Sequence, residues 1–222
     1  GNLEEYGNLA RQVFEESDIP YFIDEKHTVL MNPFVEYFRA ALEMAVQDFS
    51  YESVVRYLRC GMSCVIREEA DLLENYVLAL GIRGFKHWDE KWVRIYRGMP
   101  PESIQTLNEI RERFADETRE LALSFKGGKK TVREYCTILY EFAVKSRVQQ
   151  KLKDQEKKFR ELGDKAMEKE YAQIYGIVME LLDSMVEILG DEVVNRQDFR
   201  QLLETGLTQA KVALIPPSLD QV

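Results

Sequence analysis

One stretch of the chain, residues 131–162, contains neither glycine nor proline. It predicts a single helix of about 48 Å at 1.5 Å per residue. Gly163 and Asp164 then supply a helix stop and an N-cap in succession. Beyond them, apolar residues alternate steps of four and three, which is the pattern of a coiled-coil seam. The seam comprises Met167, Tyr171, Ile174, Val178, Leu181, Met185 and Ile188. The short turn predicts an antiparallel helix hairpin over residues 131–189, with an intermolecular coiled coil as the alternative.

Most of the remaining sequence also predicts helices, because glycine and proline lie almost entirely between periodic segments. Asn32 and Pro33 mark one helix start, since Asn caps free backbone N–H groups and Pro fits the first turn. Further helices are expected at residues 3–16, 51–60, 67–80, 101–125 and 196–211, and short strands at 19–23 and 212–215. The expected fold class is therefore mainly α: a helical bundle with a long antiparallel hairpin and short strands near both termini.

Both ends of the chain are abrupt. Residues 1–2 resemble a cloning remnant, and the last nine residues stop after a Pro-Pro pair. We therefore expect a piece of a larger protein. If the strands near the two ends belong to one sheet, the helices between them are an insertion into an α/β domain that lies outside this chain.

Composition limits the possible functions. The net charge is −9, from 30 Lys and Arg against 39 Asp and Glu, which argues weakly against a dedicated nucleic-acid module. The sequence has no run of about 18 apolar residues, so it predicts no membrane span. The three cysteines, Cys60, Cys64 and Cys136, are too few for a disulfide framework and suit a reducing cytoplasm.

No complete active site is visible. Residues 127–131, GGKKT, resemble a phosphate-binding loop only superficially and predict a flexible connection between helices. Cys60 and Cys64, with His87 as a third ligand, could hold a metal, but part-buried free thiols are favoured. His27 lies in a predicted polar loop, and no Ser or Cys is marked as a nucleophile.

Basic residues gather in two places. The first cluster is Arg83, Lys86, His87, Lys91, Arg94 and Arg97, interleaved with Trp88 and Trp92 and opposed by Asp89 and Glu90. Basic groups next to flat aromatic rings suit nucleic-acid phosphates and bases, although an ordinary packed loop is equally compatible. The second cluster is Lys145, Arg147, Lys151, Lys153, Lys157, Lys158 and Arg160, offset by Asp154 and Glu156. Alternating charges on a helix favour a solvated face.

Three blocks carry a more specific resemblance. They are IPYFIDEK at 19–26 with Asn32-Pro33 after it, ENYVLALGIRG at 74–84 followed by Trp88, and LIPPSLDQV at 214–222. The first is similar to the segment of superfamily 1 helicases where a strand leads into an inserted helical subdomain. Together with residues 107–111, they resemble the B subunit of the bacterial AddAB/RexAB helicase–nuclease. The resemblance covers about residues 3–222 and is strongest at the ends.

That family joins an inactivated helicase-like body to a nuclease domain with an iron–sulfur cluster. With its A subunit it unwinds and degrades DNA from double-strand breaks for recombinational repair. The resemblance implies 2A-like flanks at 1–32 and 212–222 around a 2B-like helical insertion at 33–211. ATP, Mg and the 4Fe-4S cluster are then expected elsewhere in the parent protein, because no residue here matches the family's nucleotide loop, nuclease or cluster motifs.

The resemblance therefore predicts a cytoplasmic, non-catalytic piece that orients DNA or packs on the A subunit. Its expected DNA contacts are Arg83, Lys86, His87, Lys91, Arg94 and Arg97. Two alternatives stay open. One is an all-α protein-interaction scaffold without DNA contact, and the other is an unrelated all-α adaptor or regulatory domain.

Overall fold

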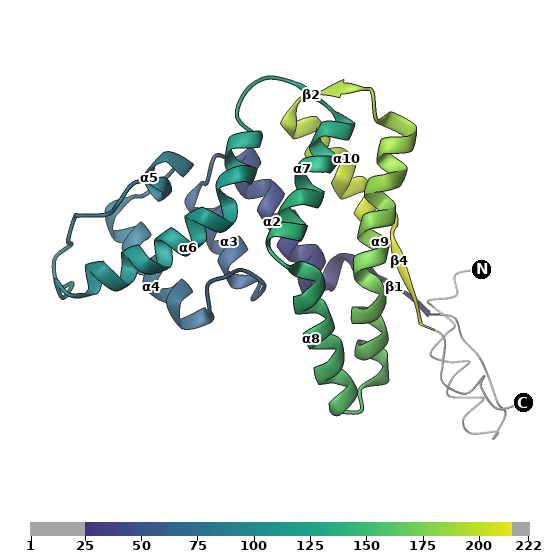
Figure 1. The fold of residues 1–222 in the computed structure, drawn as a ribbon, viewed down its shortest axis with the longest axis horizontal. Helices are drawn as coiled ribbons and strands as arrows, with labels where there is room; N and C mark the ends of the chain where they lie inside the picture. Colours follow the sequence, from purple (N-terminus) through teal and green to yellow (C-terminus); the bar gives the residue numbers. More distant parts are fainter. Residues whose placement is uncertain (1–24, 215–222) are drawn as a thin grey trace, which may run out of the picture.

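A computed structural model describes residues 25–214 and the side chains of residues 29–210. In it the chain is mainly helical (Figure 1). A 3-10 turn, η1 (Val29–Met31), leads into α2 (Pro33–Val46). A first lobe follows, made of α3 (Tyr51–Arg59), α4 (Arg67–Leu80), α5 (Phe85–Asp89) and α6 (Ser103–Ser124). The second lobe contains α7 (Val132–Lys145), α8 (Val148–Glu161), α9 (Lys165–Leu189) and α10 (Arg196–Gln209). Helix α2 contacts both lobes, through α3 on one side and α9 and α10 on the other.

The two ends of the described chain meet in a strand pair. β1 (Glu25–Thr28) runs antiparallel to β4 (Lys211–Leu214), with His27 opposite Val212. The strand and helix expected at 19–23 and 3–16 lie outside the described residues. Residues 25–28, predicted as a polar loop, form a strand instead, because β4 supplies the backbone partners. The helix expected at 196–211 ends at Gln209, since Lys211 already belongs to β4.

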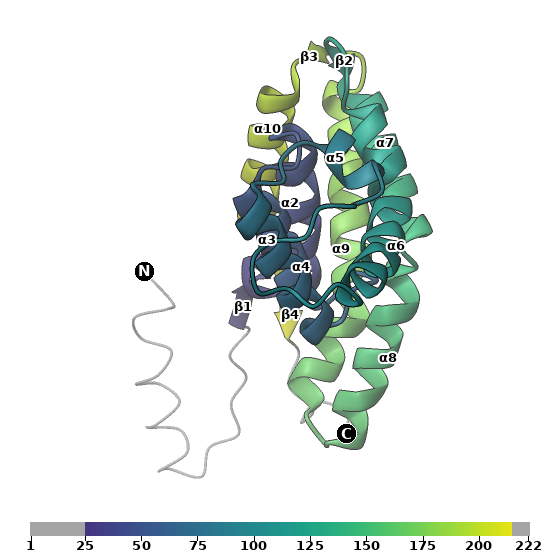
Figure 2. The same ribbon diagram turned by 90° about the vertical axis from the view of Figure 1, so that its left-hand side faces the viewer.

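A second strand pair was not predicted. β2 (Lys130–Thr131) pairs antiparallel with β3 (Val193–Val194). It closes the second lobe at the end opposite to the α8–α9 turn (Figure 2). Two-residue strands carry no periodic signal, so only the folded chain reveals them.

Local signals located the helix ends well. The side chain of Asn32 accepts a hydrogen bond from the Phe34 N–H at the start of α2, and Ser50 caps α3 in the same way. Gly81 closes α4 with φ 65°, the left-handed region that side chains disfavour. Asp164 caps α9 by accepting from the Met167 N–H, and Asn195 caps α10. These ends are confirmed because each depends on neighbours in sequence.

The single helix predicted at 131–162 is wrong. The chain breaks at Ser146 and Arg147, and Arg147 takes φ 52°, a left-handed conformation that costs a side-chain-bearing residue about 1 kcal/mol. The break directs α8 so that Val148 and Leu152 are buried. It also brings the Lys151 Nζ within 2.6 Å of the Met62 carbonyl oxygen. Tertiary contacts therefore outweigh the local preference for a continuous helix.

The hairpin itself is confirmed, but its seam shifts. Tyr171, Ile174 and Val178 are buried as predicted. Farther along α9, Leu182 is the buried residue and not the predicted Leu181. A straight helix of 3.6 residues per turn drifts away from a 3.5-residue repeat, so the seam rotates along α9. Leu181 faces α10 instead: a Cβ on Gly206 would lie 2.6 Å from its Cδ1. Ile188, the last predicted member, is 77% exposed.

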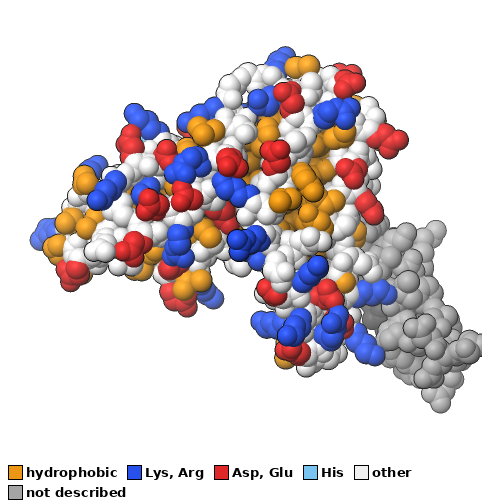
Figure 3. Space-filling view, viewed as in Figure 1, with side chains coloured by type: hydrophobic (Ala, Val, Ile, Leu, Met, Phe, Trp, Pro, Cys, Tyr) orange, Lys and Arg blue, Asp and Glu red, His pale blue; other side chains and the backbone are white. Residues whose placement is uncertain are grey.

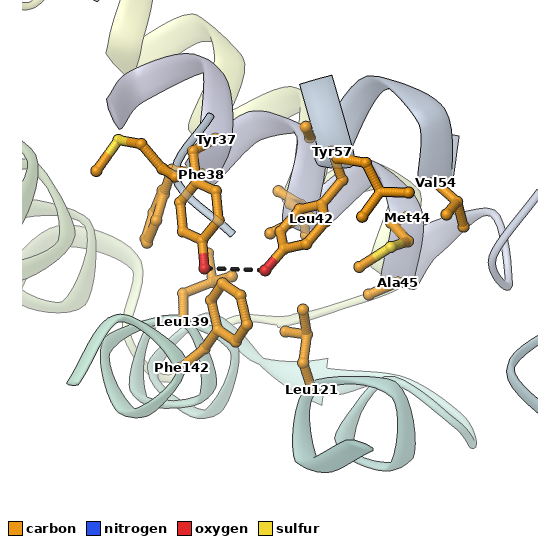
Figure 4. Packing of buried hydrophobic residues seen from close by; sticks show 14 of the residues in the cluster. Tyr37, Phe38, Leu42, Met44, Ala45, Val54, Tyr57, Leu121, Leu139 and Phe142 are labelled. Carbon is orange, nitrogen blue, oxygen red and sulfur yellow. Dashed lines mark hydrogen bonds between the residues drawn. The ribbon is translucent and has the colours of Figure 1, made fainter. Parts of the chain in front are cut away.

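The core is continuous across both lobes and includes a buried polar cluster. The hydroxyl oxygens of Tyr37 and Tyr57 lie 2.9 Å apart, and the Tyr37 ring stacks on Phe142 (Figure 4). The Tyr57 hydroxyl lies 2.9 Å from a carboxylate oxygen of Glu117, which also accepts from the Cys64 N–H. This cluster joins α2, α3, α6 and α7, and thus fixes one lobe on the other.

Candidate nucleic-acid interface

The first basic cluster lies on a bent segment between α4 and α6. After Gly81, Gly84 adopts φ 80° and its N–H donates to the Phe49 carbonyl oxygen over 3.3 Å. A Cβ on Gly84 would lie 3.5 Å from the Asp48 carboxylate, so the segment approaches the α2–α3 turn closely. Helix α5 begins directly after this contact. The start of the segment is therefore anchored to the first lobe.

Aromatic side chains hold the underside of the segment. Trp88 and Trp92 are both buried, with the Trp88 ring 4.6 Å from Phe114 of α6 and the Trp92 ring stacked 4.4 Å from Tyr76 of α4. The segment thus packs over its neighbours, as the sequence predicted. Of the two alternatives, their burial favours the packed segment over base stacking, because a buried indole presents no free face to a base.

Polar side chains fix the backbone of the same segment. Asn108 accepts from the Trp92 N–H and donates to the Trp92 carbonyl oxygen, at 2.9 and 2.8 Å. Arg111 donates to the Trp88 carbonyl oxygen over 2.7 Å, and the Tyr76 hydroxyl donates to the Arg94 carbonyl oxygen over 2.8 Å. An irregular segment held at three carbonyls presents its side chains from a fixed backbone.

The predicted contact residues all point outward. Arg83, Lys86, His87, Lys91, Arg94 and Arg97 are exposed, on one segment of the first lobe. The His87 Nδ1 lies 2.6 Å from the Arg83 carbonyl oxygen and, because that oxygen can only accept, donates to it. Lys86 lies 3.8 Å from Glu90, an exposed and weak pair. The six predicted residues are therefore exposed on one segment, and within the described part of the chain most of them have no ion-pair partner.

One of the two opposing acids is paired with a residue outside the cluster. Arg119 of α6 donates to the Asp89 carboxylate over 3.0 and 2.8 Å. Arg119 also pairs with Asp116, so it offsets only part of the negative charge of Asp89. Sequence reasoning missed Arg119, Asn108 and Arg111, because α6 reads as an ordinary amphipathic helix and the contacts span up to 30 positions. The signal in the sequence was the position of Arg111 between the apolar residues 110 and 114. Arg111 is buried in the structure.

The second basic cluster is mostly paired. Its ion pairs are Lys145–Glu120, Lys151–Glu117, Lys157–Glu161, Arg160–Glu156 and Arg160–Glu168. Most of these pairs lie on the solvated faces of α8 and α9, as the alternating charges indicated. Lys151 is the exception, because it reaches the buried cluster instead of solvent. Its Nζ lies 3.6 Å from Glu117 and over the ring of Tyr37.

The remaining candidate groups have structural roles. Cys60 and Cys64 are half-buried, and burial raises the pKa of each thiol to about 12, which disfavours the thiolate that binds metals and iron–sulfur clusters. Within the described part of the chain, no three His, Cys, Asp or Glu side chains are placed to hold a metal. A 4Fe-4S cluster takes four cysteines, and this chain has three, so its residues do not fit that cofactor.

The glycine-rich sequence at 127–131 also has a structural role. The Thr131 hydroxyl and the Thr131 N–H both lie within hydrogen-bond distance of the Glu134 carboxylate, at 2.9 and 2.7 Å. The hydroxyl in turn accepts from the Glu134 N–H, which completes a capping box at the start of α7. A hydroxyl committed to a helix cap does not serve a nucleotide-bound Mg²⁺. Among residues 25–214, no helix is both long enough and apolar enough to cross a bilayer.

The described fold is a two-lobed helical bundle whose ends return to one strand pair, with an exposed basic segment on one lobe. Comparison with known proteins then shows to which of them this chain is related. Over its full length the chain is 39% identical to the B subunit of the ATP-dependent helicase/deoxyribonuclease of Lachnoclostridium phytofermentans. It is 38% identical to the B subunits of the same name from Clostridium botulinum (strain Hall) and Clostridium novyi.

The chain spans about a fifth of the length of these relatives, at 20%, 20% and 19%. It therefore corresponds to a segment of the helicase/deoxyribonuclease B subunit, and the resemblance drawn from the sequence is confirmed. No profile of a known protein family matches the chain.

Proposed function

We propose that this chain is the accessory helical part of a helicase/deoxyribonuclease that processes DNA double-strand breaks for recombinational repair in the cytoplasm. In this proposal residues 33–211 are a 2B-like insertion, and residues 1–32 and 212–222 are the 2A-like flanks. The pairing of β1 with β4 supports an insertion, because it brings the two ends of the helical mass to one place. ATP, Mg, the iron–sulfur cluster and the catalytic groups would lie elsewhere in the parent protein.

The part played by this chain would be to orient DNA through its first basic cluster. The observation that carries this proposal is the exposure of all six basic residues on one segment whose backbone is held by Asn108, Arg111 and Tyr76. Because the tryptophans are buried, these contacts would go to phosphates and not to bases. Binding should then be independent of DNA sequence and strongly dependent on salt.

A titration with duplex DNA tests the proposal. About three phosphate contacts predict a slope near −2.7 for log affinity against log salt. Replacing Arg83, Lys91 and Arg94 with Ala should flatten that slope and weaken binding at every sequence. A matched triple substitution at Lys153, Lys157 and Lys158 changes the net charge equally on another face and should have a smaller effect. If the two triple variants weaken binding equally, this segment does not orient DNA.

A second candidate function is a protein-interaction scaffold that docks the A subunit without touching DNA. It is favoured by Val93 and Ile95, which are 75% and 48% exposed within the same segment. Pull-down of the A-type subunit, carried out beside the DNA titration, separates the two functions. The proposal also predicts that the purified chain hydrolyses neither ATP nor DNA, and sustained turnover by clean protein would contradict it.

A further inference from the structure

A solvent-open apolar groove lies between α7 and α9, on the second lobe. The apolar residues that line its cavity of about 400 Å³ are Cys136 and Tyr140 from α7 and Met179, Leu182 and Val186 from α9, and the polar lining residues are Arg133, Thr137 and Asp183. Figure 3 shows this region as a gathering of hydrophobic side chains on the face seen in Figure 1. The groove is independent of the basic segment, which belongs to the other lobe.

The groove exists because the hairpin is closed at one end and open at the other. Near the turn, Phe159 of α8 lies 5.3 Å from the ring of Tyr171 of α9 and fills the space between the helices. Beyond the break at Arg147, α7 follows a different course from α8. Helix α9 is therefore in less extensive contact with α7 than with α8. On the open part, Tyr140 and Val144 of α7 stay 50% and 54% exposed. They are four residues apart and thus lie on one face of α7, on which Tyr140 lines the groove.

The α9 border of the groove is acidic. Asp183 lines the groove, and Glu180 and Glu187 lie one turn before and after it on the same edge of α9. Among the described residues, none of these three carboxylates has an ion-pair partner. On the α7 side, Arg133 lines the groove and is paired with Asp191. The groove therefore combines an apolar floor with unpaired negative charge along its α9 side.

From these features we infer that the α7–α9 groove binds an amphipathic helix of a partner polypeptide, with an apolar face flanked by Lys and Arg. Two helices that lie side by side leave a ridge-and-groove surface into which a third helix packs. The three acids of α9 select a basic flank by charge complementarity and repel nucleic acid from this face. The occupant is thus a protein helix, and the inference stands whether or not the basic segment binds DNA.

Three designed peptides of equal length test this inference in fluorescence-anisotropy titrations with the chain. The first has a Leu stripe with Lys flanks, the second has the same stripe with Glu flanks, and the third has the composition of the first in scrambled order. We expect only the first to bind. Equal binding of the scrambled peptide would mean that net charge alone attracts it, and equal binding of the acidic peptide would mean that the carboxylates select nothing. Either result overturns the inference, as does the absence of any binding.

Substitutions then locate the site. Tyr140→Ala should weaken the basic peptide about tenfold, because large aromatic residues dominate such interfaces. Leu123→Ala is the matched control, since Leu123 is 52% exposed but lies on α6 and does not line the groove. Asp183→Lys should weaken the basic peptide and allow the acidic one to bind. Sedimentation of the chain alone checks for a different occupant: self-association abolished by Tyr140→Ala would show that a second copy fills the groove and would refute the partner assignment.

Discussion

Replacement of Glu117 by Ala should strongly destabilise the chain, because this carboxylate is the acceptor at the centre of the buried polar cluster. Its oxygens lie 2.9 Å from the Tyr57 hydroxyl and 3.1 Å from the Cys64 backbone nitrogen. A third partner, the Lys151 ammonium, lies 3.6 Å away. The Glu117 side chain is only 7% exposed, so water cannot replace these contacts.

The expected loss follows from the groups left behind. Two buried donors that lose a charged acceptor cost about 1.5–3 kcal/mol each. Lys151 is 32% exposed and regains water, so its contribution is small. The free energy of unfolding should therefore fall by about 3–5 kcal/mol, the range for breaking a buried charged network. Glu117→Gln keeps one acceptor oxygen and should cost about half as much.

Urea unfolding followed by far-ultraviolet circular dichroism measures this loss, with an unchanged m-value as the sign that two-state unfolding is preserved. Glu120→Ala is the matched control on the same helix. Glu120 is 73% exposed and lies 3.2 Å from Lys145, and an exposed pair contributes at most about 1 kcal/mol. If Glu117→Ala lowers the free energy no more than Glu120→Ala, the cluster does not join the lobes.

Three further predictions concern single positions. Arg147→Gly should raise the free energy of unfolding by up to about 1 kcal/mol by relieving the left-handed backbone, whereas Arg147→Ala should not. Burial, and then the charge of Asp183, raises the pKa of Cys136 to about 12, so alkylation by iodoacetamide at pH 8 should be about 10³-fold slower than for a free thiol. Burial raises the pKa of Tyr37 and Tyr57 well above 10. Their contribution to stability is complete below pH 10 and is lost as pH rises beyond it, so Tyr57→Phe should lessen the alkaline loss of stability measured by denaturation.

The basic segment shows how far sequence reasoning reached at the candidate site. The six exposed residues were found, because charge and clustering are visible in one dimension. The sequence left the role of Trp88 open between base stacking and packing, since it does not show which face of a ring another helix covers. The pairing of Arg119 with Asp89 was not visible for the same reason, since the two residues lie 30 positions apart.

The sequence by itself determined where most helices begin and end, and that the chain is a helical bundle with a hairpin. Caps such as Asn32 and Asp164 act on backbone groups within three residues, so their effect is local. Only the tertiary structure decided the break at Arg147, the pairing of β1 with β4 and the open α7–α9 groove. Each of these depends on contacts between distant segments, and such contacts can outweigh a local preference worth about 1 kcal/mol.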